Sequence, residues 1–402
     1  MRMTPVVFGL LVLCVSLSSA KAADSIEEAF ANGEGHINFR YRFENVDQDG
    51  FPNDAHASTL RTRLNYRTDS FNGLSFFAEL DDITYLGDDD FNNTRNGQVT
   101  YPVVADPDGA DVNQLYLDYK MDNTLLRLGR QRINLDNQRF VGGVGWRQNE
   151  QTYDALSLVN TALQDTKIQY TFVGNVSRIF GPEDGTPAKS IDSESHLINV
   201  NYKTSGDASV SGYAYLMELK DAQALSNRTI GLRYSRTFQS QDLTFPLNVE
   251  FANQKDYGDN PVSYSANYYL VEVGVSMDKV KVLVGNEVLE GNDTSAGEAF
   301  VTPLATLHKF QGWADKFLAT PAAGIDDKYF TVSGNVLGGS LGLTYHVFEA
   351  ESGSADYGTE WDVAYNRKLS DHLGLLLKLA RYQEDGLSTD TTKAWVMLTA
   401  DF

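Results

Sequence analysis

The stretch Leu125–Leu156 reads LLRLGRQRINLDNQRFVGGVGWRQNEQTYDAL, and its pattern recurs along the whole chain. Its first third alternates apolar residues with polar or small ones, which is the period-two pattern of a β-strand. A connector rich in Gly and Asn then interrupts the alternation, and a second strand pattern resumes at Tyr153. Because the connector carries Arg139, Trp146 and Arg147, we interpret it as a loop that folds into the mouth or lumen of a β-barrel and narrows a channel.

The first 22 residues have the three parts of a secretory signal peptide. Arg2 supplies a positive charge, residues 6–17 form a short apolar run, and Ala20-Lys21-Ala22 matches an A-x-A cleavage site. The run is too short to span a membrane as a helix. We therefore predict a signal peptide at residues 1–22 and one mature domain at residues 23–402. The only cysteine of the chain lies in the signal, so the mature domain has no disulfide.

The composition excludes two broad classes of protein. The chain has 33 Lys and Arg against 54 Asp and Glu, and this formal net charge of −21 argues against a nucleic-acid partner. No run of about 18 apolar residues follows the signal, so a helical membrane protein is excluded. A β-barrel with a polar lumen remains compatible, because only alternate residues of each strand need to be apolar.

Period-two alternation predicts 18 strands between residue 36 and residue 402. Each strand has about the ten residues that a tilted strand needs to cross a bilayer. The connections after even-numbered strands are short, whereas most of those after odd-numbered strands are long. Short turns at one rim and long loops at the other are typical of bacterial outer-membrane proteins. We predict an all-β fold, a transmembrane antiparallel up-and-down β-barrel of about 18 strands in the outer membrane of a Gram-negative bacterium.

The ends of the mature chain indicate how the barrel meets its surroundings. Residues 23–35 are too few for the plug domain of an energy-coupled receptor. The last strand is amphipathic and ends at Phe402, which resembles the signal read by the outer-membrane assembly machinery. Outer-membrane lipid and lipopolysaccharide are the other expected partners. The sequence leaves the oligomeric state open between monomer and trimer.

The same alternation assigns a group of arginines to the lumen. We predict an arginine-rich constriction that attracts anions, since Arg makes bidentate contacts with carboxylates and stays charged at every working pH. The alternative is that these arginines balance the Glu and Asp residues around them. The pore-lining and ligand candidates are Arg40, Arg42, Arg61, Arg63, Arg127, Arg130, Arg132, Arg139, Trp146, Arg147 and Asp154.

A second distinctive segment is residues 302–324, TPLATLHKFQGWADKFLATPAAG. Its large apolar residues recur at helical spacing, so we predict an amphipathic segment in a long loop. This segment either enters the lumen, caps the outer mouth or folds on a small core of its own. Its candidate contacts with a sugar are His308, Trp313 and Asp315.

No catalytic or metal site is evident from the residues. The six histidines are scattered, none lies at metal-ligand spacing, and no Gly-flanked serine nucleophile is present. We therefore expect no enzyme activity, no cofactor and no metal. A barrel hydrolase that uses His346 or His372 and a structural or adhesion barrel remain as alternatives.

Motifs in these two stretches resemble the alginate export porin family. The resemblance implies an 18-stranded barrel with an arginine-rich constriction for polyuronate or another anionic carbohydrate. The family's dedicated exporter has an extended periplasmic loop, whereas the even-numbered connections here are short. We therefore predict passive diffusion of small anionic solutes, sugar acids or oligouronates, with export of an anionic exopolysaccharide such as alginate as the alternative. The matching motifs are Gly129-Arg130-Gln131, Arg139-Phe140-Val141-Gly142, Trp146, Thr152-Tyr153-Asp154 and the run TLHKFQGWADKF.

Overall fold

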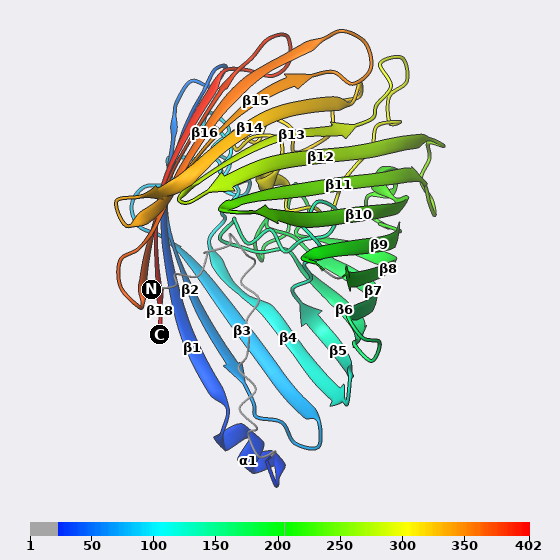
Figure 1. Ribbon diagram of the computed structural model, residues 1–402. Helices are drawn as coiled ribbons and strands as arrows, with labels where there is room; N and C mark the ends of the chain where they lie inside the picture. The colour runs from blue at the N-terminus through cyan, green and yellow to red at the C-terminus, as the bar shows by residue number, and fades with distance from the viewer. Residues whose placement is uncertain (1–22, 205) are drawn as a thin grey trace.

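The computed structural model describes residues 23–204 and 206–402. The signal peptide predicted at residues 1–22 lies outside the described residues. Figure 1 shows a continuous wall of strands with irregular segments of the chain inside it. No helix in the described part of the chain is long and apolar enough to span a membrane.

The wall consists of 18 antiparallel strands in one sheet. Each strand pairs with its neighbours in the chain, and β1 pairs with β18 to close the barrel, so the predicted fold and strand number are confirmed. The strands are β1 (Glu34–Gln48), β2 (Ala55–Arg67), β3 (Leu74–Tyr85), β4 (Gly109–Met121), β5 (Thr124–Gln131), β6 (Thr152–Asn160), β7 (Thr166–Ser177), β8 (Ser190–Thr204), β9 (Ala208–Met217), β10 (Asn227–Ser240), β11 (Leu243–Asp256), β12 (Ser265–Met277), β13 (Val280–Leu289), β14 (Ile325–Val336), β15 (Gly339–Glu349), β16 (Asp356–Lys368), β17 (Leu373–Gln383) and β18 (Thr391–Asp401).

The two rims of the barrel differ as predicted. Two residues connect β4 to β5, and Asp122 in this turn has a φ of 43°, which is the left-handed conformation of a tight hairpin. The long connections at the other rim include residues 86–108, 132–151 and 290–324. A short helix, α1 (Ile26–Ala31), lies at the rim with the short turns, where the Ala29 carbonyl accepts a hydrogen bond from the Asp69 amide (2.9 Å).

The outer surface is apolar, and the inner surface carries the charge. Leu64 of β2, Leu117 of β4 and Leu128 of β5 are more than half exposed, and they face outward. The residues that alternate with them face inward and include buried Arg63 and Asp118. This division is the one that a bilayer outside and a polar lumen inside require.

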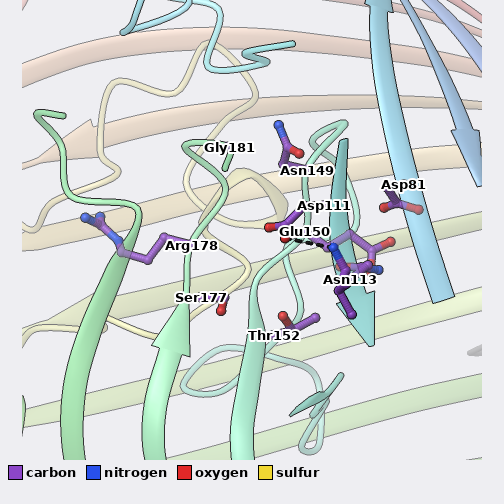
Figure 2. A pocket seen from close by; sticks show the side chains of 10 residues that line it. Asp81, Asp111, Asn113, Asn149, Glu150, Thr152, Ser177, Arg178 and Gly181 are labelled. Carbon is purple, nitrogen blue, oxygen red and sulfur yellow. Dashed lines mark hydrogen bonds between the residues drawn. The ribbon is translucent and has the colours of Figure 1, made fainter. Parts of the chain in front are cut away.

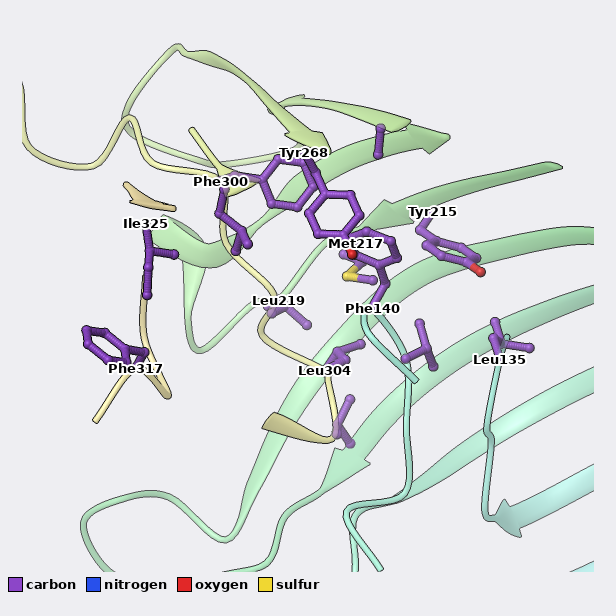
Figure 3. Packing of buried hydrophobic residues seen from close by; sticks show 14 of the residues in the cluster. Leu135, Phe140, Tyr215, Met217, Leu219, Tyr268, Phe300, Leu304, Phe317 and Ile325 are labelled. Carbon is purple, nitrogen blue, oxygen red and sulfur yellow. The ribbon is translucent and has the colours of Figure 1, made fainter. Parts of the chain in front are cut away.

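The main hydrophobic core lies inside the barrel, between the wall and two infolded loops (Figure 3). Phe140 of the β5–β6 loop (132–151) packs against Tyr268 of the wall and Phe300 of the β13–β14 loop (290–324), with ring centroids 5.2 and 5.8 Å away. Leu304 is fully buried in the same cluster. Burial of these residues holds both loops in the lumen.

The predicted amphipathic segment at 302–324 is not an amphipathic helix. Its described helical part is the single 3-10 turn η2 (Leu307–Lys309), like the isolated turn η1 (Gln223–Leu225) elsewhere in the chain. Gly312 has a φ of 82°, and the amides of Trp313 and Ala314 donate to carboxylates of the wall instead of to helix carbonyls. The apolar residues therefore reach several parts of the lumen rather than one helix face.

Candidate functional site

The β5–β6 loop and the β13–β14 loop join across the lumen into one unit, which we call the partition. The Gly142 amide donates to the Leu304 carbonyl (2.8 Å), and the Thr306 amide donates to the Gln138 carbonyl (3.0 Å). Residues 291–327 therefore enter the lumen and do not form a cap outside the barrel, which was one of the alternatives. The partition narrows the lumen, so the groups that hold it also determine the shape of the channel.

Two arginines of β1 bind backbone carbonyls of the β5–β6 loop. Arg40 donates from Nε to Gln148 Oε1 (2.9 Å) and from Nη1 to the Gly145 carbonyl (2.7 Å). Arg42 donates to the Trp146 carbonyl. Both guanidinium groups are buried, at 7% and 1% exposure, so their hydrogen bonds serve the loop rather than the open lumen.

Two of the three arginines of β2, Arg61 and Arg63, converge on one carboxylate of the loop, Glu150. Arg63 Nη1 lies 3.0 Å and Arg61 Nη1 lies 3.5 Å from Glu150 Oε1, and Arg63 also binds Asp81 through two bonds of 2.6 Å. Figure 2 shows Glu150 beside Asn113, from which it accepts a hydrogen bond of 3.4 Å. Burial by itself raises the pKa of Glu150, but the surrounding guanidinium groups outweigh it and hold the pKa well below its ordinary value.

Arg147 and His308 meet at Asp315 of the β13–β14 loop. Arg147 Nη2 lies 3.3 Å from Asp315 Oδ2, and His308 Nδ1 lies 2.6 Å from Asp315 Oδ1. Lys393 of β18 binds the same carboxylate at 2.7 Å. Burial lowers the pKa of His308 to about 3 in spite of the carboxylate, so the imidazole is neutral.

Arg139 crosses the lumen to the opposite wall. Its Nε lies 2.9 Å from Glu287 Oε1 of β13, and its Nη1 donates to Thr302 Oγ1 (3.2 Å). The guanidinium also lies 4.8 Å from the ring centroid of Phe310. With 1% exposure, Arg139 braces the partition against β13.

Two of the predicted arginines remain open to the lumen. The side chains of Arg127 and Arg132 are 23% and 30% exposed, and they line a cavity of about 200 Å³ together with Gln131, Ser157 and Gln169. Arg127 binds Asp118 (2.7 Å), and Arg132 binds Glu150 and Glu79. Among the described residues, no carboxylate lines this cavity, so its charged lining consists of guanidinium groups alone.

Arg130 and Asp154 do not line the lumen. They pair across β5 and β6 with Nε and Oδ1 2.8 Å apart. By strand alternation, they share a face with Leu128 and Leu156, which are 61% and 42% exposed on the outside of the barrel. The prediction that these two residues line the pore is therefore corrected: pairing runs through Gly129-Arg130-Gln131 without a shift of register, and the middle residue points outward.

The second loop contributes one of its three predicted residues to an open space. Trp313 lines a cavity of about 470 Å³ beside the wall of β10–β16, together with Phe310, Gln311 and Arg233. The side chains of His308 and Asp315 are instead only 8% and 6% exposed, and they bind each other inside the partition. The prediction that His308 and Asp315 contact a sugar is corrected accordingly.

Several residues of this network were missed by sequence reasoning. Glu44 and Asp106 form ion pairs with Arg147. Lys378 and Lys393 bind side chains of the β13–β14 loop and thereby hold it to the wall. A signal for Lys378 was present, because it is a lone lysine in the apolar run LLLKLA and must face inward when the leucines that alternate with it face lipid.

A closed barrel with an apolar outside and a charged lumen narrowed by infolded loops is a porin-like outer-membrane channel. Outer-membrane lipid and lipopolysaccharide therefore surround it. The chain belongs to the alginate export family, whose model matches residues 35–267. No curated protein matches the chain in sequence.

Solved structures with the same fold are outer-membrane porins. Acinetobacter baumannii OccAB4 has a TM-score of 0.71 and 14% identity, over 92% of this chain and 98% of that one. Pseudomonas aeruginosa OccK9 (OpdG) has a TM-score of 0.72 and 14% identity, over 93% and 99%. Pseudomonas aeruginosa OpdK, solved with vanillate, has a TM-score of 0.69 and 11% identity, over 93% and 99%. The family and these neighbours are porins or export channels, not enzymes.

Proposed function

We propose that this porin passes small anionic solutes, sugar acids or oligouronates, by passive diffusion, and that Arg127 and Arg132 attract them. The observation that carries the proposal is the cavity whose charged lining consists of these two guanidinium groups. Guanidinium groups bind carboxylates through paired hydrogen bonds. A positive lining of this kind favours anions in a pore even when the protein as a whole is acidic.

The relatives support a carboxylate as the common chemistry. The family is named for export of alginate, a polyuronate, and OpdK was solved with vanillate, which is an aromatic carboxylate. Both ligands carry the group that the open arginines of this chain suit. The acceptance of a sugar ring is supported by Trp313 and Phe310, which line the larger cavity with several polar side chains.

Export of an intact exopolysaccharide is the less favoured alternative. The partition is fastened to opposite walls by Arg139–Glu287 and by the arginines of β1 and β2. A polymer chain needs a continuous wide lumen, and these buried contacts oppose one. The short connections at the rim of β4–β5 also offer little surface for a periplasmic partner.

Single-channel recording in planar bilayers under a KCl gradient tests the proposal. We expect the sign of the reversal potential to show that anions pass more readily than cations. We also expect oligouronates to block the current. Arg127→Gln and Arg132→Gln should reduce both effects without leaving a lone buried charge, because Asp118 keeps Arg67 and Glu150 keeps Arg61 and Arg63.

Arg130→Gln is the matched control, since it makes the same substitution on the outward face of the same strand. It should leave the reversal potential unchanged. A cation-selective wild-type channel, or an anion preference that survives the double substitution of Arg127 and Arg132, would contradict the proposal.

The processing of the chain belongs to the same proposal. We propose that signal peptidase cleaves after Ala22, so that the mature barrel begins at Ala23. Intact-mass measurement of protein extracted from outer membranes checks the start of the mature chain. A mature chain that still carries residues 1–22 would overturn this assignment.

A further inference from the structure

Three of the four tryptophans of the chain surround one lysine. Lys378 Nζ lies 3.6 Å from the ring centroid of Trp313, 4.2 Å from that of Trp146 and 5.2 Å from that of Trp395. The remaining tryptophan, Trp361, is 42% exposed on the outer surface. The grouping of three indole rings around one ammonium is the arrangement by which proteins hold organic cations.

The three rings come from three separate parts of the channel. Trp146 belongs to the β5–β6 loop, Trp313 to the β13–β14 loop and Trp395 to β18. Lys378 lies on β17 directly opposite Trp395. One side chain of the wall therefore contacts both halves of the partition at once.

The polar contacts of Lys378 also join the wall to the partition. Its Nζ lies 2.6 Å from His308 Nε2, and the other ring nitrogen of His308 binds Asp315. Because the imidazole is neutral and Nδ1 donates to the carboxylate, Nε2 is free to accept from the ammonium. No carboxylate among the described residues lies within ion-pair distance of Lys378, so the ring faces and His308 are its partners.

The indole rings depend on this contact more than on their own polar edges. The Nε1 groups of Trp146 and Trp395 are buried and have no hydrogen-bond partner among the described residues. Trp146 makes its contacts through the faces of its ring. The His308 ring stacks on it with centroids 4.3 Å apart, and the Arg42 guanidinium lies 4.5 Å from its centroid. Removing the ammonium would therefore loosen both loops at the place where they meet the β17–β18 wall.

We propose that the Trp146–Trp313–Trp395 cage is an organic-cation site occupied by Lys378, and that this contact sets the width of the channel by latching the partition to the wall. The inference rests on the proposed passive channel but not on its preference for anions. The cage would accept a primary alkylammonium in place of the lysine, since such an ion has the same charged group on the same kind of stem.

Lys378→Met and Lys378→Ala test the latch, with Lys281→Met as the matched control. Met keeps most of the apolar stem and removes the charge, whereas Lys281 lines the larger cavity without contacting the cage. Heat-modifiable electrophoretic mobility establishes that each variant is a folded barrel. We expect both Lys378 variants to spend about 30-fold more time in a wider conductance state, the scale set by one desolvated cation–π contact.

Propylammonium, the part of the side chain that Lys378→Ala removes, should return that variant to wild-type conductance. Acrylamide quenching of tryptophan fluorescence gives a second readout that needs no current. Quenching should increase in both Lys378 variants and fall again with propylammonium. If folded Lys378→Met matches wild type in conductance and in quenching, the latch is overturned. A failure of anion selectivity would appear only in the reversal potential, so the two proposals fail separately.

Discussion

Trp146 and His308 lie face to face, with ring centroids 4.3 Å apart and ring planes within 7° of each other. They come from different loops, and their stacking makes the two infolded loops a single partition. The partition is held by buried polar and aromatic contacts rather than by regular secondary structure. Its stability therefore responds to single substitutions and to pH, as the following predictions describe.

Gly142→Ala should separate the two loops. A Cβ at Gly142 would lie 2.2 Å from Thr306 Oγ1 and 2.9 Å from Gln138 Cβ, where the loops hydrogen-bond to each other. We expect a wider and noisier channel in single-channel recordings. Gly145→Ala is the control in the same loop, because its added Cβ meets nothing closer than Glu150 Oε1 at 3.7 Å. Equal conductance in the two variants would show that the loop junction does not limit the channel.

Arg139→Met should destabilise the folded barrel by about 3–5 kcal/mol, because it leaves the Glu287 carboxylate buried without its partner. The double variant with Glu287→Leu should recover part of this loss, since neither charge then remains. Urea unfolding of the refolded protein in detergent measures both values. If the double variant were no more stable than Arg139→Met, the ion pair would not be the cause.

Acid should loosen the β13–β14 loop through His308. Its pKa is about 3 in the docked loop and near its ordinary value of 6.5 in an undocked one, so only the undocked imidazole takes up a proton between these values. Docking is thus fully stable above pH 6.5 and loses roughly 1.4 kcal/mol per pH unit below it. Acrylamide quenching of tryptophan fluorescence should therefore rise as the pH falls from 7 to 4.5.

His308→Asn should flatten this pH profile, because the asparagine has no proton to gain in the window. Asp315 acts in the same direction but at lower pH. Burial raises the pKa of Asp315, but the hydrogen bond from the neutral His308 and the charges of Lys393 and Arg147 outweigh burial and hold this pKa well below its ordinary value, so the docked carboxylate stays ionised. An unchanged acid response in His308→Asn would assign the effect to another group.

Phe402→Ala should impair assembly but not folding. The backbone of Phe402 exchanges two hydrogen bonds with Ile37, whereas its ring is 60% exposed and contacts His372. We expect less barrel in outer membranes of cells, but normal refolding of the purified variant in detergent. Phe251→Ala, at another exposed outward phenylalanine, is the control and should affect neither measurement. Normal assembly of Phe402→Ala in cells would exclude the terminal ring as the assembly signal.

Alternation along each strand was enough to predict the barrel. In a strand without a bulge, the face that a side chain takes depends on whether its position is odd or even, which is a local property. This rule placed Arg40 and Arg63 inside and Leu64 and Leu117 outside before any contact was known. Applied strictly, the same rule would also have placed Arg130 on the outside, where the structure has it paired with Asp154.

Only the tertiary structure decided which inward-facing charged side chains bind the loops and which face the open channel. The β5–β6 loop places its carbonyls against Arg40 and Arg42 and its Glu150 against Arg63. Of the arginines predicted to line the pore, this leaves Arg127 and Arg132 at an open cavity. The wall arginines and their loop acceptors are far apart in the sequence. Whether they come into contact depends on the path of an irregular loop backbone. No period in the sequence encodes that path, because each turn of the loop is fixed by the wall that it touches. The sequence by itself thus determined a closed barrel with a charged interior, and packing within the lumen decided which charges hold the loops and which face the channel.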